Sequence, residues 1–133
     1  MPHLSKRKID QDTEKLIDSA LVWTFSRLKG NEVNFVFSSL LTPTERLMLA
    51  KRLGILFLLN EDKTEDNTAE TLKVTQQTVS RINLQHKLVA PQASNFIFRK
   101  LSNWKEFTAF KNAMEELALG ALKAFSRGMA GKI

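Results

Sequence analysis

The stretch "TAETLKVTQQTVSRIN", residues 68–83, has the pattern of two short helices joined by a sharp turn. Thr64 can cap the first helix and Thr75 the second, because a threonine hydroxyl accepts hydrogen bonds from the free backbone N–H groups at a helix start. Lys73 stands in the turn, where we expect a positive φ at a cost of roughly 1 kcal/mol. Four apolar side chains would form the core that the two helices share: Leu72, Val74, Val79 and Ile82. The stretch therefore predicts a helix-turn-helix over about residues 64–87.

The surface of the second helix carries side chains that suit DNA. The segment from Lys73 to Lys87 contains basic residues and no acid. A glutamine amide can bond the edge of adenine, a serine hydroxyl can reach either kind of base, and an arginine suits guanine or phosphate. The expected DNA-binding residues are Gln76, Gln77, Thr78, Ser80, Arg81 and Lys87. The bare pattern also occurs in proteins that bind no nucleic acid, so a helical protein-interaction module is an alternative.

The composition favours a mostly helical globular protein with a polyanionic partner. The 133 residues include only 5 Gly and 3 Pro, and the net charge is +6. The charge is uneven, because residues 61–83 hold three basic and five acidic residues whereas residues 84–133 hold eight and three. A basic excess attracts nucleic acid. The acids among residues 61–83 all precede Thr71, so they belong to the supporting helix and need not face DNA.

Other classes of protein are disfavoured by what the sequence lacks. No apolar run approaches the roughly 18 residues of a membrane span, and the basic start "MPHLSKRKID" is followed by no apolar stretch, so we expect neither a membrane segment nor a secretory signal. The absence of cysteine rules out disulfides and thiolate metal sites and fits a cytoplasmic location. His3 and His86 lie far apart, and no metal site is expected. No phosphate-binding loop or nucleophile–base pair is recognisable, so we expect no catalytic residues and no enzyme activity.

The chain is expected to form a basic arm over residues 1–8 and a single helical domain over residues 9–133. Apolar periodicity predicts a first helix over residues 10–29, while residues 33–41 form either a short helix or a packed connector. "APQAS", residues 90–94, interrupts the pattern. A long amphipathic helix over about residues 102–127 follows, within a C-terminal helical extension at 90–133.

"TPTE", residues 42–45, predicts the start of a central helix that runs to about Leu59. Thr42 and Glu45 can form a capping box, and Pro43 loses no hydrogen bond at the first helical position. The end of this helix is apolar on every side and should be buried. Both this helix and the first one carry more apolar surface than one chain of this length can cover. We therefore predict a homodimer whose core includes Trp23, Phe25, Leu53, Leu56, Phe57 and Leu59.

The stretches "LLTPTERLMLAKRLGILFLL", residues 40–59, and "TAETLKVTQQTVSRI", residues 68–82, together resemble the tryptophan repressor superfamily, including its YerC/YecD-type relatives. The most specific parts are "LTPTER" and "TVSR". The resemblance covers roughly residues 40–83 and implies an all-α, intertwined homodimer whose paired helix-turn-helix units grip double-stranded DNA. It implies transcriptional repression, with bases read by Gln76, Gln77 and Ser80. Transposase subunits also carry such helix pairs, so a DNA-binding subunit of a mobile element is a further alternative.

The resemblance also raises the question of an effector. Tryptophan-responsive members hold the amino acid with a threonine before the proline, an arginine in the central helix and an arginine in the recognition helix, and Thr42, Arg52 and Arg81 stand at those places. Those members have a glycine after the last arginine, which leaves room for the indole. This chain has Ile82 there, so tryptophan is not expected as a corepressor and no cofactor is predicted.

Overall fold

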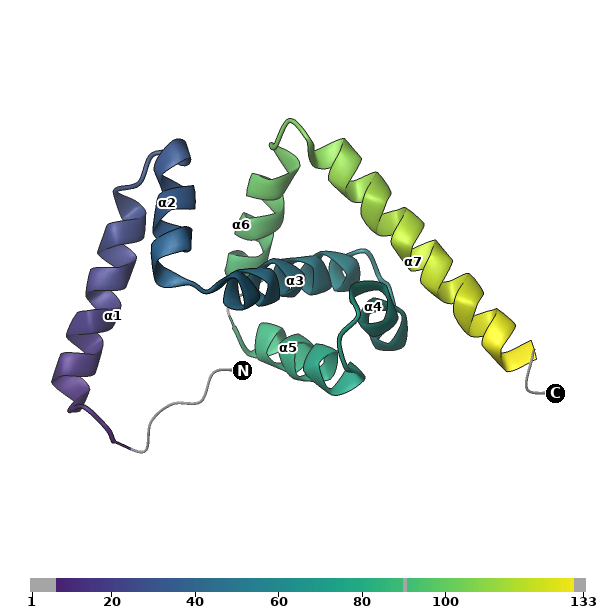
Figure 1. Ribbon diagram of the computed structural model, residues 1–133, viewed down its shortest axis with the longest axis horizontal. Helices are drawn as coiled ribbons and strands as arrows, with labels where there is room; N and C mark the ends of the chain where they lie inside the picture. The colour runs from purple at the N-terminus through teal and green to yellow at the C-terminus, as the bar shows by residue number, and fades with distance from the viewer. Residues whose placement is uncertain (1–6, 90, 131–133) are drawn as a thin grey trace. The chain divides into compact units, whose positions relative to one another are not determined.

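The computed structural model describes residues 7–89 and 91–130, and this described part is built from seven α-helices without any strand (Figure 1). The helices are α1 (Gln11–Ser26), α2 (Gly30–Leu40), α3 (Pro43–Asn60), α4 (Glu65–Leu72), α5 (Gln76–Leu88), α6 (Pro91–Ser102) and α7 (Phe107–Ala130). The predicted all-α fold class is confirmed. The chain divides into two compact units, residues 1–46 and 47–133. Most of the basic arm predicted over residues 1–8 lies outside the described residues.

In the first unit, an acidic side chain stabilises the start of each helix. The Asp10 carboxylate accepts a hydrogen bond from the Thr13 backbone N–H at 3.0 Å. The Glu32 carboxylate accepts one from the Lys29 backbone N–H at 2.7 Å. Negative groups at this end of a helix satisfy free N–H donors and interact favourably with the helix dipole. Of the two alternatives for residues 33–41, the structure therefore has the helix, α2.

The central helix α3 begins as the sequence predicts. The Thr42 backbone N–H donates to Glu45 Oε1 at 2.9 Å, and the Glu45 backbone N–H donates to Thr42 Oγ1 at 3.1 Å. These reciprocal bonds are the predicted capping box. Gly54 lets α4 approach closely, because a Cβ at this position would lie 3.2 Å from Leu72 Cδ1. The second half of α3 is buried, as predicted, at Gly54, Ile55, Phe57 and Leu58.

Two clusters of apolar side chains include residues of α3 within the second unit. Ile55 belongs to one cluster, with Ala69 of α4 and Val79 and Ile82 of α5. Phe57 and Leu58 belong to another, together with Ala118 and the surrounding Phe98, Leu101, Phe107, Phe110 and Met114. The Phe57 ring lies 5.0 Å from the Phe110 ring in an edge-on arrangement that aromatic pairs favour. The apolar character of the second half of α3 is thus explained by its neighbours in two clusters.

The C-terminal region differs from the sequence prediction. The interruption expected at residues 90–94 is shorter than predicted, because α5 ends at Leu88 and α6 already begins at Pro91. Proline is tolerated at the first helical position, where the missing N–H would have no partner within the helix. The last helix begins at Phe107 rather than near Ser102. Trp104 lies in the turn before it, where its backbone N–H donates to the Leu101 carbonyl at 3.0 Å.

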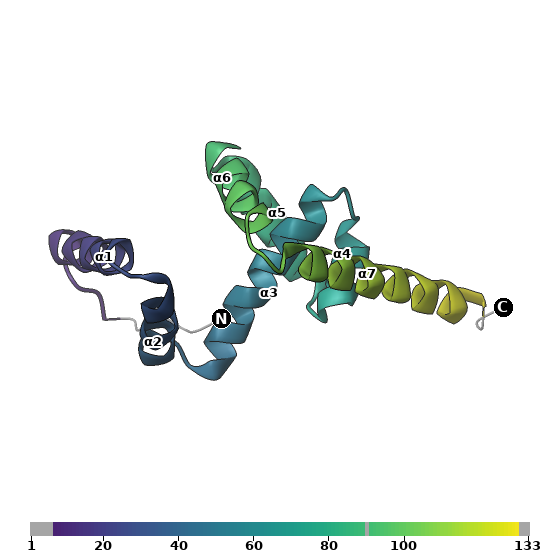
Figure 2. The same ribbon diagram turned by 90° about the horizontal axis from the view of Figure 1, so that it is seen from above.

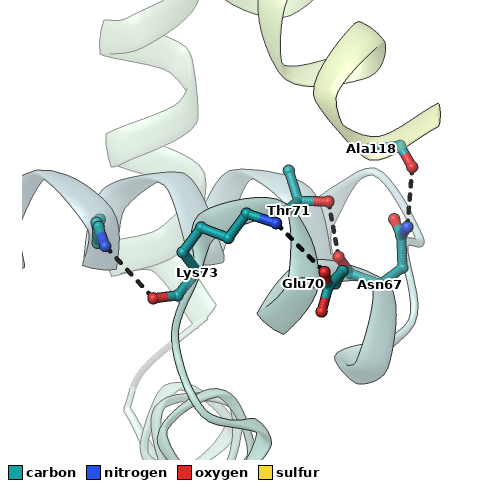
Figure 3. Close-up of polar contacts among 6 residues, drawn as sticks. Asn67, Glu70, Thr71, Lys73 and Ala118 are labelled. Carbon is teal, nitrogen blue, oxygen red and sulfur yellow. Dashed lines mark hydrogen bonds and ion pairs between the residues drawn. The ribbon is translucent and has the colours of Figure 1, made fainter. Parts of the chain in front are cut away.

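Helix α4 lies between α5 and α7, and it contacts both (Figures 1 and 2). On the α7 side, Asn67 Nδ2 donates a hydrogen bond to the Ala118 carbonyl at 2.9 Å, as Figure 3 shows. Ala118 is buried, and its small side chain allows the close approach of the two helices. Helix α4 is therefore held by α7 as well as by α5.

Candidate nucleic-acid interface

The helix-turn-helix consists of α4, a short turn and α5. Thr64 caps α4 by accepting a hydrogen bond from the Asn67 backbone N–H at 3.0 Å, and Thr75 caps α5 by accepting one from the Thr78 backbone N–H at 3.2 Å. Both caps fall at the residues that the sequence predicts. Each helix start thereby satisfies one of its free N–H donors.

The turn between the helices depends on a left-handed residue. Lys73 has a φ of 56°, which confirms the predicted positive φ. The next backbone N–H, that of Val74, donates to the Ala69 carbonyl at 3.0 Å and closes the end of α4. The Lys73 side chain turns back to Glu70 (Figure 3). The Lys73 Nζ–Glu70 Oε1 distance is 3.2 Å, and Lys51 Nζ donates to the Lys73 carbonyl at 3.5 Å.

The core of the helix pair contains the apolar residues that the sequence indicates. Val79 is 0% exposed and Ile82 is also buried. Leu72 and Val74 are partly buried against the same cluster. Ile55 of α3 completes this core from outside the motif. The orientation of α5 is therefore fixed by contacts with two other helices.

The residues predicted to contact DNA fall into two groups. Gln76, Gln77, Arg81 and Lys87 are exposed on α5. Thr78 is half-buried, and its hydroxyl lies 2.9 Å from that of Thr75. An exposed amide or guanidinium on a rigidly held helix can meet a base edge or a phosphate, whereas a hydroxyl within a cap is already bonded.

Ser80 lies differently from the other polar residues of α5. Its hydroxyl donates to Glu65 Oε1 at 2.8 Å, and Asn83 Nδ2 donates to Glu65 Oε2 at 2.8 Å. These hydrogen bonds, that of Asn83 first and that of Ser80 second, lower the pKa of the Glu65 carboxyl, and nearby Lys87 lowers it further. Both oxygens of one carboxylate thus tie the first turn of α4 to the middle of α5.

Sequence reasoning missed this link between Glu65 and α5. The available signal was the three-residue spacing of Ser80 and Asn83, which puts both on one face of a helix. Identifying their partner requires the angle between α4 and α5, since Glu65 lies 15 and 18 residues earlier in the chain. The helical periodicity of the sequence does not predict the angle between α4 and α5.

The three possible effector residues have different surroundings. Thr42 caps α3 in the first unit, and Arg81 is exposed on α5. Arg52 lines a cavity of about 190 Å³ in the second unit. The remaining lining residues are Leu56, Ile82, Gln85, His86, Val89, Ala93 and Ile97. Of the three candidates, only Arg52 faces this cavity, and Ile82 forms part of its wall.

The described part of the chain has neither a metal-binding cluster nor a membrane-spanning helix. No cluster of three or more His, Cys, Asp or Glu side chains among residues 7–89 and 91–130 could hold a metal ion. No helix among the same residues is long and apolar enough to span a membrane.

Comparison with known protein families gives one match. The model of the family described as Trp repressor protein matches residues 20–101, more than half of the chain. The chain belongs to the Trp repressor family. The matched region runs from within α1 to α6 and includes the whole helix-turn-helix, whereas α7 lies outside it. No curated protein and no solved structure matches the chain.

Membership confirms the resemblance inferred from "LTPTER" and "TVSR" and extends it beyond residues 40–83 on both sides. The Trp repressor family consists of DNA-binding transcription regulators with a helix-turn-helix. The α4–turn–α5 unit is that motif in this chain.

Proposed function

We propose that this protein is a sequence-specific repressor of transcription that binds double-stranded DNA through α5. The observation that carries the proposal is the exposure of Gln76 and Gln77 at the N-terminal end of a helix that the buried Val79 and Ile82 hold in place. The N-terminal end of a recognition helix is the part that contacts base edges in the major groove. Each glutamine amide can form a bidentate pair with adenine.

The other predicted residues take supporting parts in this proposal. Arg81 and Lys87 lie further along α5 and would neutralise phosphates, which positions the protein without selecting a sequence. Thr78 contributes through the cap at the start of α5. Ser80 is held by Glu65 in the free protein, so base reading rests first on the two glutamines.

We further propose that the repressor acts as an intertwined homodimer. In the single chain, large apolar side chains of the first three helices are exposed: Leu16, Ile17, Leu21, Val22, Trp23, Phe35, Leu40, Leu47, Met48 and Leu49. Some of them line an apolar groove of about 440 Å³ between α1 and α2. Exposed apolar surface of this kind marks a protein interface. A second copy is the simplest cover, because it presents the same helices in a self-complementary arrangement.

Tryptophan is not required for DNA binding in this proposal. Ile82 is buried and forms part of the wall of the cavity that Arg52 lines. A branched side chain in that place reduces the space for an indole ring. Calorimetric titration with tryptophan tests this, and saturable binding that improves DNA affinity would contradict it.

Selection of bound sequences from a random pool of double-stranded DNA tests the central proposal. We expect a palindromic consensus, because a two-fold symmetric dimer binds two equivalent half-sites. Affinity should fall steeply between two salt concentrations, since bound phosphates release counterions. An absence of binding to double-stranded DNA would contradict the proposal and favour the protein-interaction module.

A further inference from the structure

A stripe of four side chains runs along the outer face of α5. Gln77, Arg81, Leu84 and Leu88 follow one another at spacings of four, three and four residues, so they share one face of the helix. All four are exposed. Leu84 and Leu88 are 62% and 80% exposed, although leucine is among the residues most often buried. The stripe thus combines the proposed DNA-contacting residues with two uncovered apolar side chains.

The polar residues next to Leu84 do not share its outward direction. The Ser80 hydroxyl and the Asn83 amide both donate to the Glu65 carboxylate at 2.8 Å, so both are directed toward α4. Because these hydrogen bonds turn Ser80 and Asn83 toward α4, Leu84 is the next side chain after Gln77 and Arg81 on the outer face of the helix. A helix face that contacts only water is expected to be polar, whereas the outer face of α5 carries leucine.

The charge along this part of the sequence favours a polyanion as the occupant of this face. Between residues 71 and 105 the chain contains no Asp or Glu, and its basic residues there are Lys73, Arg81, Lys87, Arg99, Lys100 and Lys105. The major groove of DNA combines nearby phosphates with one apolar group on the base edges, the 5-methyl of thymine. A leucine side chain that covers this methyl group buries apolar surface, which is favourable. A groove edge with only hydrogen-bond donors and acceptors offers no apolar surface to bury.

We propose that Leu84 contacts the 5-methyl group of a thymine in the major groove and thereby determines part of the DNA sequence preference. The proposal rests on the proposed DNA-binding function of α5. Leu84 lies seven residues beyond Gln77, about 10 Å along the helix axis, so both side chains reach one groove within a few base pairs. Leu88 lies one turn further from the N-terminal end of α5, and we do not assign it a contact with a thymine methyl group.

Replacement of thymine by deoxyuridine tests the proposal, because it removes the methyl group and leaves every hydrogen-bonding group of the base in place. The full-length protein is titrated against its selected duplex and against duplexes that carry deoxyuridine at single thymine positions. We expect the affinity of the wild-type protein to fall about fourfold at one position in each half-site, as the loss of one covered methyl implies. Leu84→Ala should bind the thymine and deoxyuridine duplexes equally.

Leu88→Ala is the matched control, because it removes the same side chain from the same face one turn away. It should keep the full difference between thymine and deoxyuridine. Wild-type protein that binds the duplex but distinguishes no thymine from deoxyuridine overturns the assignment of Leu84 alone. A Leu84→Ala variant that becomes monomeric by sedimentation and keeps its methyl preference also overturns it, since Leu84 would then contact a second copy. Failure of the wild-type protein to bind any double-stranded DNA overturns the proposed function itself, and the assignment with it.

Discussion

The helix pairs α1–α2 and α4–α5 are both short and both carry apolar stripes, but only one of them has a core in the single chain. Val79 of α5 is completely buried. In the described structure no residue of α1 or α2 is buried to that degree, and Trp23 is 61% exposed. The difference arises because Ile55 of α3 packs against the α4–α5 pair. A helix pair acquires a core when a third element covers its apolar side.

The α1–α2 pair and the α4–α5 pair therefore differ in function. The α4–α5 pair is completed within one chain, so its outer face is oriented before any partner arrives. The α1–α2 pair retains apolar surface for the second copy that we propose. The following predictions test this division, beginning with the largest expected effect.

Ile55→Ala should lower the free energy of unfolding by about 2–5 kcal/mol, because it leaves a cavity between α3 and the α4–α5 pair. Denaturant titration measures the loss. Leu119→Ala serves as the control, since the side chain of Leu119 is exposed on α7 and its truncation should change stability by less than about 0.5 kcal/mol. Equal losses for the two variants would show that the helix-turn-helix core is not what stabilises the second unit.

Trp23→Ala should weaken self-association by about tenfold or more, because a large aromatic side chain in the centre of an interface contributes strongly to binding. Sedimentation equilibrium over a micromolar concentration range measures the monomer–dimer balance. The Leu119→Ala variant again serves as the control and should associate like the wild type. A wild-type protein that stays monomeric throughout this range would refute the proposed role of α1 and α2.

Replacing Gln76 or Gln77 by Ala should cost about 1–3 kcal/mol of DNA binding and relax the preference at one position per half-site. The stability of the protein should hardly change, because both side chains are exposed. Titration of each variant against the selected duplex and against single-base variants of it provides the measurement.

Lys87→Ala provides the contrast to the glutamine variants. It should weaken binding to all sequences alike and lower the salt slope by about one unit, because a phosphate contact positions without selecting. If Gln76→Ala and Gln77→Ala leave the sequence preference unchanged, the outer face of α5 does not read DNA.

The link between Glu65 and α5 should make stability depend on pH in the acidic range. Hydrogen bonds from Asn83 and Ser80 hold the pKa of Glu65 below its ordinary value of 4.5. The folded state therefore favours the ionised carboxylate, and this stabilisation is present above pH 4.5 and is lost as the pH falls through the lowered pKa. Unfolding titrations of wild type and Glu65→Gln should show a smaller loss on acidification for the variant. Identical pH profiles would exclude a contribution from Glu65.

The local features of the fold followed from the sequence. Thr42 with Glu45, Thr64 and Thr75 cap helices as predicted, and Lys73 has the expected positive φ. Such features depend on hydrogen bonds and steric limits among residues only a few positions apart. The family could also be inferred from the sequence, because two specific stretches stand in the right order. The exposed positions of Gln76 and Gln77 followed from the period of the recognition helix.

Other features were decided only by the tertiary structure. The Glu65 carboxylate bonds Ser80 and Asn83 of another helix, and Phe57 packs against Phe107 and Phe110 of α7, some fifty positions along the chain. Each of these contacts depends on the angle at which two helices cross. Helical periodicity gives the face on which a side chain lies but not the helix that it meets. The sequence therefore predicted which residues of α5 would contact DNA, and the packing of α4 against α5 decided that Ser80 is bonded to Glu65 while Leu84 is left uncovered.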